Sequence, residues 1–364
     1  MHHKNNNQKR DRMKKKIFYI AAGVVTIVII GVIALGYGIM QDSRIKAAQS
    51  INQLEPGLYT LTYEGDYGFD EYLAQGGGAS DAIMAQYITT FLTNGLASAP
   101  APDTTSNYGC STFVLHGTSG KLMGRNFDFD TATRAMIVRT KPSNGYASVS
   151  TACIDFIGMP SEWQPDGDMI SRISALASIY LPLDGINEKG LCIADLISGD
   201  NEETHQATDK PDLTITAAIR LILDKAATVD EAIELLTQYD INSSIGTSHH
   251  FAIADSTGKS VVVEYIDNKM YVTNTRTVTN HYLTQGDKCG IGNEFSHQRF
   301  DMINHVCDSI SDQYDVETAM NILSQASYQD YTQWSIVFDM DARKAHYVWN
   351  RQYTDSLHTF SILQ

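Results

Sequence analysis

An uncharged apolar run of 24 residues, IFYIAAGVVTIVIIGVIALGYGIM at positions 17–40, constrains the organisation of this chain most strongly. As a helix it would be about 36 Å long, enough to cross a hydrocarbon layer of about 30 Å. A cleavable signal peptide is the alternative, but its apolar core is usually only about 7–15 residues long and ends near a small-residue cleavage site. The length of the run, with no A-x-A site close behind it, favours an uncleaved signal anchor.

The charges beside the apolar run predict its orientation. Residues 1–16 hold seven of the 27 Lys and Arg residues but only one of the 42 Asp and Glu residues. Positive charge stays on the cytoplasmic side, so everything after Gln41 is expected outside. We therefore predict a single-pass protein of the cell membrane, with a cytoplasmic basic tail (1–16), a transmembrane anchor (17–40) and an extracytoplasmic remainder.

The remainder of the chain is acidic, with 20 Lys and Arg residues against 41 Asp and Glu residues. A surface with this excess of negative charge repels phosphate backbones and anionic lipid surfaces. We therefore expect no nucleic acid partner, and membrane contact only through residues 17–40. About 320 residues suffice to bury a large hydrophobic core.

The region before Cys110 is predicted to be a stalk and pro-segment, residues 41–109. Residues 41–57 are expected to form the stalk. LYTLTYEG (58–65) alternates like a strand, and 80–96 has helical spacing of apolar residues. LASAPAPDTTSNYG (96–109) carries two prolines and many small residues, which is typical of an exposed linker.

The region from Cys110 to the C-terminus is predicted to be one domain, residues 110–364. CSTFVLH and KLMGRNFDF would form a hairpin around GTSG. Further on, the patterns predict helices at 213–226, 228–239, 295–311 and 317–327, a three-stranded meander at 249–274 and a closing hairpin at 334–350. Strands grouped with helices in this order indicate sheets covered by helices, in an α/β or α+β domain.

The five cysteines do not form a metal or redox motif, because none belongs to a C-x-x-C pair. Cys153 and Cys192 lie in apolar runs and are expected to be buried. Cys289 and Cys307 are the best candidates for a disulfide, which an oxidising exterior would permit. The adjacent pair His249 and His250 is unsuited to one metal ion, because neighbouring residues of a strand point to opposite faces. We expect no metal and no cofactor.

The stretch SNYGCSTFVLHGTSGKLMGRNFDFD (106–130) contains the candidate nucleophile, Cys110. A thiol attacks as thiolate, so it needs a cation nearby or a base to take its proton. The signature that surrounds a papain-type cysteine is absent. Cleavage between Gly109 and Cys110 would instead give Cys110 a free α-amine, whose pKa of about 7.7–8.0 suits a general base. The nucleophile would then become N-terminal by processing, autocatalytic or by another protease.

GCSTFV followed by GRNFDFD resembles the opening of the linear amide C–N hydrolases. This N-terminal-nucleophile group includes choloylglycine hydrolases, penicillin V acylases and acid-ceramidase-like amidases. Four later segments resemble family motifs in the same order: DGINEKGLCIADL (184–196), HHFAIADSTGKSVVVEY (249–265), VTNHYLT (278–284) and HQRFD (297–301). The resemblance implies an α+β fold, a four-layer α-β-β-α sandwich, preceded here by the one transmembrane helix.

The resemblance also implies a role for five residues. Cys110 would be both nucleophile and base, and Arg125 would favour its thiolate. Asp128 would hold the Cys110 amine. The side-chain amide of Asn280 would face the developing oxyanion, and Arg299 would complete the polar cluster.

One position departs from the family pattern. Many members carry a second oxyanion-side Asn shortly after the N-E-x-G-L segment, and this chain has Ile197 there. A backbone N–H could replace it, and Asn187 is a possible further site residue, although its D-G-I-N-E-K-G context is typical of a turn. The anchor and folded pro-segment resemble the acid-ceramidase-like amidases, which implies that the cut segment stays bound.

These observations predict a membrane-anchored cysteine amidase that hydrolyses the linear C–N bond of a small N-acyl amide through a thioester. The substrate would be an N-acyl amino acid, an N-acyl amine, or a bile-salt-like or penicillin V-like amide. An acyltransferase of the same fold is one alternative. A non-catalytic surface binding protein is another, with Cys110 as buried filler and Arg125 and Asp128 as a plain ion pair of the hairpin.

Overall fold

The computed structural model describes residues 42–93, 108–129, 132–160, 162–200, 202–243, 246–328, 330–354 and 357–362. The predicted basic tail, the predicted anchor and most of the predicted linker lie outside these residues. Across the described ranges, no helix is both long enough and apolar enough to cross a membrane.

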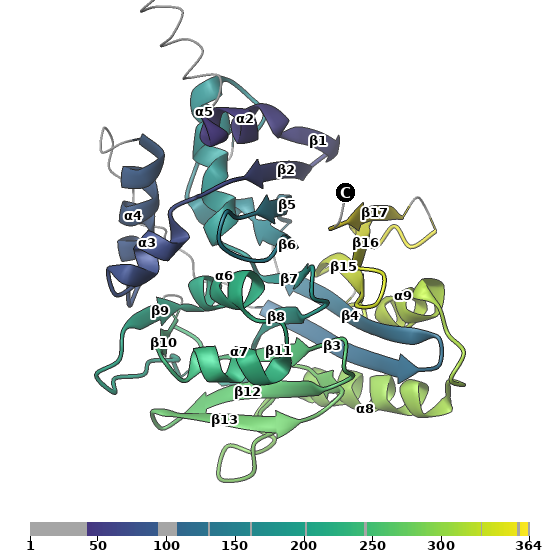
Figure 1. Ribbon diagram of the computed structural model, residues 1–364. Helices are drawn as coiled ribbons and strands as arrows, with labels where there is room; N and C mark the ends of the chain where they lie inside the picture. The colour runs from purple at the N-terminus through teal and green to yellow at the C-terminus, as the bar shows by residue number, and fades with distance from the viewer. Residues whose placement is uncertain are drawn as a thin grey trace, which may run out of the picture.

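Two large sheets and one small one form the framework (Figure 1). The nine-stranded sheet has the order β1 (Asn52–Glu55), β2 (Leu58–Glu64), β5 (Ala135–Lys141), β6 (Ser148–Cys153), β7 (Asp184–Asn187), β8 (Cys192–Ile197), β11 (His249–Ala254), β12 (Ser260–Ile266) and β13 (Lys269–Asn274). The six-stranded sheet has the order β14 (Thr277–Val278), β3 (Tyr108–Gly117), β4 (Gly120–Phe129), β15 (Thr332–Asp339), β16 (Lys344–Trp349) and β17 (His358–Ser361). β9 (Asp212–Thr214) and β10 (Asp240–Asn242) form a separate parallel pair.

Helices cover the outer faces of both sheets. The helices are α2 (Ser43–Ser50), α3 (Phe69–Ala74), α4 (Asp81–Thr93), η1 (Ile154–Ile157), α5 (Met169–Ala175), η2 (Leu176–Tyr180), α6 (Ile215–Lys225), α7 (Val229–Leu236), α8 (Glu294–Ser309) and α9 (Val316–Gln325). One core cluster joins the nine-stranded sheet to the helices from α2 to α7, and another joins the six-stranded sheet to α8 and α9. A third cluster fills the space between the two sheets. The predicted four-layer α-β-β-α order is confirmed.

The period-two pattern of β3 assigns its side chains to two of these layers. Cys110 and Val114 belong to the cluster between the sheets, whereas Phe113 and Leu115 belong to the cluster under α8 and α9. Successive residues of a strand point to opposite faces, so the alternation places the Cys110 thiol between the sheets.

The stalk predicted for residues 41–57 is not what the structure shows. α2 packs with Ala47 and Ala48 buried, and β1 pairs antiparallel with β2. β2 runs parallel to β5 along its whole length, and Leu61 is fully buried. Residues 43–64 are therefore part of the nine-stranded sheet and its helical cover. The eight-residue α2 buries only two alanines, so its apolar periodicity is too weak to be recognised in the sequence.

Most other predicted elements are confirmed. The hairpin after Cys110 is β3 and β4, the meander is β11, β12 and β13, and the closing hairpin is β15 and β16. The four predicted C-terminal helices are α6 to α9, and Thr228 caps α7 by accepting a hydrogen bond from the Glu231 N–H. The predicted helix at 80–96 is α4 in its described part.

The predicted disulfide between Cys289 and Cys307 is wrong, since all five cysteines are free thiols. Cys307 lies on α8 and faces the core under the six-stranded sheet, while Cys289 is exposed in the loop before α8. The expected burial of Cys153 and Cys192 is confirmed, at 0% exposure for each.

Candidate active site

The β3–β4 hairpin brings Cys110, Arg125 and Asp128 together. In its register Cys110 lies opposite Phe127, and Gly109 lies opposite Asp128. Arg125 is two residues from Phe127, so it points to the same face as Cys110 and lies diagonally across from the thiol. Asp128 points to the other face, beside Gly109.

Asn280 and Arg299 reach Cys110 from two other elements. β14 runs antiparallel to β3 with Val278 opposite Thr112, so Asn280 comes level with Cys110. Arg299 lies on α8, whose first turn is capped by the Asn293 side chain. The Cys110 N–H donates to Asn280 Oδ1 at 2.7 Å, and Arg299 donates to the Cys110 carbonyl oxygen at 2.9 Å. The five residues predicted from the sequence thus form one buried cluster.

The orientation of the Asn280 amide follows from its partners. Its Oδ1 accepts from two groups that can only donate, the Cys110 N–H and an Arg299 N–H at 2.8 Å. Its Nδ2 donates to the Ile197 carbonyl oxygen at 2.9 Å. Ile197, which lacks the expected side-chain donor, therefore contributes a backbone acceptor that fixes Asn280. The oxyanion role of Asn280 stays a prediction, because its N–H groups face Ile197 in the uncleaved chain.

The buried charged residues of the hairpin, Arg125 and Asp128, do not form an ion pair with each other. Asp128 pairs with Arg299 at 2.9 Å and also accepts from the Thr332 hydroxyl at 2.6 Å. Arg125 pairs instead with Asp184 at 3.2 Å, and both side chains are fully buried. Each ion pair therefore joins the hairpin to another element, and Arg125 and Asp128 are not each other's hydrogen-bonded partners.

Asp184 is a site residue that the sequence analysis missed. It is the first residue of β7, in the nine-stranded sheet, and it faces Arg125 of the six-stranded sheet. The indole N–H of Trp334 donates to the same carboxylate oxygen at 3.1 Å. Its position at the head of DGINEKGL, a segment already identified as a family motif, was the available signal.

Burial dominates the titration of the thiol. It raises the pKa of Cys110, while the charge of Arg125 lowers it and the charge of Asp128 raises it further. Hydrogen bonds from Arg125 and from the Asp128 backbone N–H also lower the thiol pKa. Burial likewise raises the pKa of Asp128 and of Asp184, and the paired guanidinium opposes the rise in each case. In the uncleaved chain burial therefore disfavours the thiolate form of Cys110, while the neighbouring Arg125 guanidinium favours it.

Gly109 fits tightly against the site. A Cβ at this position would lie 3.3 Å from the Asp128 carboxylate and 3.6 Å from the Tyr328 ring. Tyr328 also packs against Phe295 with the two rings tilted, at 4.2 Å between ring centroids, and Arg299 lies over the Phe295 ring at 4.7 Å. Gly109 is thus packed between the Asp128 carboxylate and the Tyr328 ring.

Asn187 has the structural role that its turn context predicts. Its Oδ1 accepts from the N–H groups of Lys189 and Leu191, which closes the β7–β8 turn. Its Nδ2 donates to the carbonyl oxygens of Leu223 and Ala226, at the end of α6. These contacts engage both amide atoms in holding the turn to the helix.

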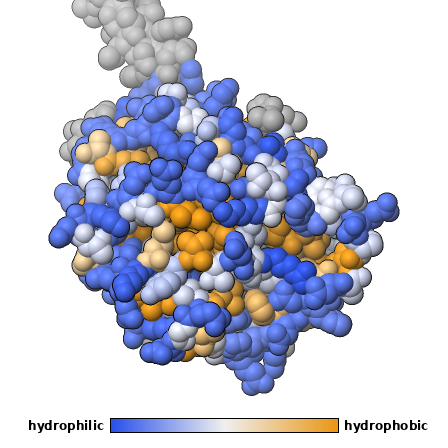
Figure 2. Space-filling model, turned by 60° about the horizontal axis from the view of Figure 1, so that its bottom comes forward, coloured by the Kyte–Doolittle hydropathy of each residue, from blue (hydrophilic) through white to orange (hydrophobic). Residues whose placement is uncertain are grey.

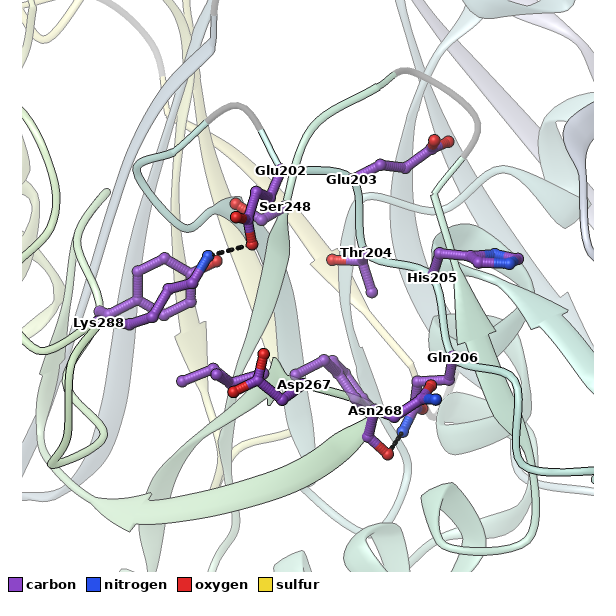
Figure 3. A pocket seen from close by; sticks show the side chains of 12 residues that line it. Glu202, Glu203, Thr204, His205, Gln206, Ser248, Asp267, Asn268 and Lys288 are labelled. Carbon is purple, nitrogen blue, oxygen red and sulfur yellow. Dashed lines mark hydrogen bonds and ion pairs between the residues drawn. The ribbon is translucent and has the colours of Figure 1, made fainter.

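A separate polar pocket lies where the 202–206 segment meets the β12–β13 turn (Figure 3). Glu202 and Lys288 form an ion pair across it, and Cys110 is not among its lining residues. Figure 2 shows one face of the molecule, where apolar residues reach the surface in several patches between hydrophilic ones. Within the part of the chain that the structure describes, no group of three or more His, Cys, Asp or Glu residues could hold a metal ion.

The comparisons agree with this geometry. Residues 110–282 match the family described as "Linear amide C-N hydrolases, choloylglycine hydrolase family", and the match begins at Cys110. A penicillin V acylase of Pectobacterium atrosepticum is 33% identical over 103 residues, which are 26% of this chain and 27% of the relative. The aligned part therefore spans only about a quarter of that relative.

Solved structures share the fold over a larger region. A penicillin V acylase from Agrobacterium tumefaciens superposes with a TM-score of 0.51 and 18% identity, covering 70% of this chain and 87% of its own. A mutant form of a conjugated bile acid hydrolase from Clostridium perfringens gives a TM-score of 0.52 and 17% identity, covering 70% of this chain and 92% of its own. The fold is thus the α+β N-terminal-nucleophile hydrolase fold. Over residues 110–282, just under half of its length, the chain is similar to the choloylglycine hydrolase family of linear amide C–N hydrolases, a family of amidohydrolases.

Proposed function

We propose that this protein is a cysteine amidase that hydrolyses the linear C–N bond of a small N-acyl amide after cleavage between Gly109 and Cys110. One observation carries the proposal: the polar cluster is built around the main chain of Cys110 as well as around its sulfur. Asn280 binds the Cys110 nitrogen and Arg299 binds its carbonyl oxygen, while Arg125 faces the thiol. A buried cysteine that served only as core filler would not need its backbone nitrogen placed in this way.

Cleavage would turn that nitrogen into the base. The new α-amine would lie on the same residue as the thiol, so proton transfer needs no further positioning. The cluster contains two guanidinium groups, Arg125 and Arg299, and two carboxyl groups, Asp128 and Asp184. Transfer of the thiol proton to the amine gives a thiolate and an ammonium, so the net charge of the buried cluster does not change. This balance avoids the large cost of creating one unpaired buried charge.

The reaction would proceed through a thioester. The Cys110 sulfur attacks the carbonyl carbon of the substrate, and the carbonyl oxygen becomes an oxyanion stabilised by the Asn280 amide. The C–N bond then breaks, and the departing amine takes a proton from the Cys110 ammonium. Water, deprotonated by the α-amine, attacks the thioester and releases the carboxylic acid and the free thiol. The chain supplies all of these groups without a cofactor.

Cleavage would leave the segment before Gly109 in place. β2 lies between β1 and β5 in the nine-stranded sheet, with its side chains packed in the core. Removing it would expose this apolar surface and the unpaired edge of β5. We propose that residues 42–93 remain bound after cleavage. With the anchor at residues 17–40, the cut segment would hold the catalytic chain at the outer side of the cell membrane.

A substrate screen tests the proposed function. Processed protein is incubated with N-acyl amino acids, N-acyl amines, a penicillin V-like amide and a bile-salt-like amide, and release of amine and acid is measured. The names of the similar proteins support including the last two compounds. We expect at least one class to be hydrolysed, and hydrolysis to disappear in Cys110→Ala. Complete inactivity of protein whose Cys110 is demonstrably N-terminal would contradict the proposal and favour the binding protein.

A further inference from the structure

We propose that Asp184 is the positioning residue for the nucleophile. It orients the Arg125 guanidinium toward the Cys110 sulfur and balances the charge of that guanidinium. As a result, the Cys110 thiolate forms only together with the α-ammonium group of the same residue. This inference rests on the proposed function, because it concerns the same thiol. It assigns a chemical role to a residue 74 positions along the chain from the nucleophile, in the opposite sheet.

The contacts of Arg125 leave it a single orientation. Its Nε donates to Asp184 Oδ2 at 3.2 Å, and one terminal nitrogen donates to the Asp195 carbonyl oxygen at 3.0 Å. The other terminal nitrogen donates to the Asn126 carbonyl oxygen. Only Asp184 among these three partners carries a charge in the contact. It is therefore the group whose loss would change both the direction and the electrostatic effect of the guanidinium.

Asp184 is itself held in place. Trp334 donates its indole N–H to the carboxylate oxygen that binds Arg125, and its ring stacks on Phe127 at 4.0 Å between centroids. Phe127 lies opposite Cys110 in the hairpin. The ion pair thus sits in a rigid aromatic frame between the sheets, where water cannot replace a lost partner. A charge interaction in such a setting is much stronger than at a surface.

The neighbouring charges define what Asp184 changes. The other charged and titratable groups that act on this cluster come from both sheets, from α8 and from the C-terminal region: Asp128, Asp195, Arg299, Tyr347 and Arg351. Asp128 and Arg299 compensate each other at 2.9 Å. Asp184 is consequently the partner that balances Arg125. Without Asp184, the uncompensated charge of Arg125 would stabilise the Cys110 thiolate by itself. The thiolate would then form without a protonated α-amine beside it, and the leaving amine would lack its proton donor.

Two substitutions with opposite expected effects test this role in the processed full chain. Asp184→Asn keeps the shape but removes the negative charge, so the thiol should ionise at lower pH. The double substitution Arg125→Gln with Asp184→Asn removes both charges, leaves no unpaired buried ion, and should make the thiol ionise at higher pH. The readout is the rate of Cys110 alkylation by iodoacetamide against pH, measured by peptide mass, with thiolate ultraviolet absorbance as a second record.

A nearby charged group shifts a thiol pKa by about one unit or more, so alkylation at about pH 7 should become about tenfold faster in Asp184→Asn. It should become several-fold slower in the double variant. Trp334→Phe removes only the N–H contact to Asp184 and keeps the Asp184 charge, so it should shift the alkylation profile less than Asp184→Asn does. Asp195→Asn should move the profile little, since Asp195 binds Arg125 through its carbonyl oxygen.

Hydrolysis gives a separate reading. Asp184→Asn should lower kcat more than it changes KM, because the protonated α-amine is depleted while the substrate surface is unaltered. A purely structural role for Asp184 would leave the pH profile of alkylation unmoved in Asp184→Asn, and that result would overturn the proposal. Alkylation requires no substrate, so the test stands even where the screen for amide hydrolysis fails.

Discussion

Two regions of this molecule bury their side chains for different purposes. Residues 42–93 contain none of the predicted catalytic residues, yet they contribute β2 to the interior of the nine-stranded sheet and α3 and α4 to its cover. The β3–β4 hairpin buries Cys110, Arg125 and Asp128, each engaged with polar partners from elsewhere in the chain. The first region holds the fold together by apolar contact, and the second places reactive groups.

The difference between these two regions explains how the chain could be cleaved while both fragments stay folded and bound to each other. The proposed cleavage at Gly109 would separate the two regions covalently. Their packing does not depend on that bond, because β2 is paired with β5 on the far side of the cut. The segment that the sequence predicts to be a pro-segment is an integral part of the nine-stranded sheet. Substitutions in the two regions should therefore affect different properties, and the following predictions test that division.

The largest expected effect is the loss of chemistry in Cys110→Ala. Removing the only proposed nucleophile should reduce hydrolysis to background, a loss of several orders of magnitude. Thermal stability should change little, because the substitution removes one small atom next to a well-packed frame. Circular dichroism and intact mass check that the fold persists and that the chain stays whole. A variant that is still cut at Gly109 would show that another protease performs the cleavage.

Leu61→Ala should show the reverse behaviour. Leu61 is fully buried on β2, and truncation of a buried leucine costs about 2–5 kcal/mol of unfolding free energy. Urea unfolding should detect this loss in the whole protein, including the catalytic region, with the thiol chemistry of the folded fraction unchanged. Thr62→Ala, at the neighbouring exposed position, is the control and should change stability by less than about 0.5 kcal/mol. Equal stability of both variants would mean that the segment is dispensable.

A smaller, pH-dependent effect on the free energy of unfolding is expected at Glu264, next to the loop that follows Asn280. Glu264 accepts from the N–H groups of Leu283 and Thr284, in the loop that follows Asn280, and from the His250 ring. Burial would raise its pKa, but these contacts hold it below the ordinary value of 4.5. The depressed pKa means that the stabilisation is present above about pH 4.5 and is lost as the pH falls through the folded-state value.

Glu264→Gln should therefore destabilise the protein by about 1–3 kcal/mol at neutral pH. The difference from the wild type should shrink below pH 4.5, the ordinary pKa of this carboxyl group. Urea unfolding at a series of pH values measures it. A difference that grows on acidification would show that the Glu264 carboxylate is not a stabilising acceptor in the folded state.

The sequence predicted best what is local. The β3–β4 hairpin follows from two alternating runs around GTSG, and the register of that hairpin alone brings Arg125 near Cys110. The family motifs also supplied Asn280 and Arg299, which no local pattern would have joined to Cys110 across 170 and 189 positions. These long-range contacts come from tertiary packing, so they required the resemblance.

What the sequence did not predict depends on contacts between distant elements. Asp184 meets Arg125 only because two sheets pack face to face, and neither strand indicates that pairing by itself. Residues 43–55 were predicted to be a stalk because the contacts that bury them come from distant parts of the chain. One such partner is Arg172, whose guanidinium donates to the carbonyl oxygens of Ala48 and Ile51. The Cys289–Cys307 pairing failed because cysteine spacing says nothing about which side of α8 faces the core.

The most direct test of the account is the mass of the purified protein, measured in denaturing and in native conditions for the wild type and for Cys110→Ala. The account predicts that the denatured wild type separates into a fragment ending at Gly109 and a fragment beginning with Cys110. Under native conditions the same sample should give one complex with the mass of both fragments, while Cys110→Ala gives a single chain in either condition. A wild-type chain that stays whole while it hydrolyses an amide would contradict the terminal-amine mechanism, and fragments that separate under native conditions would contradict the structural role of residues 42–93.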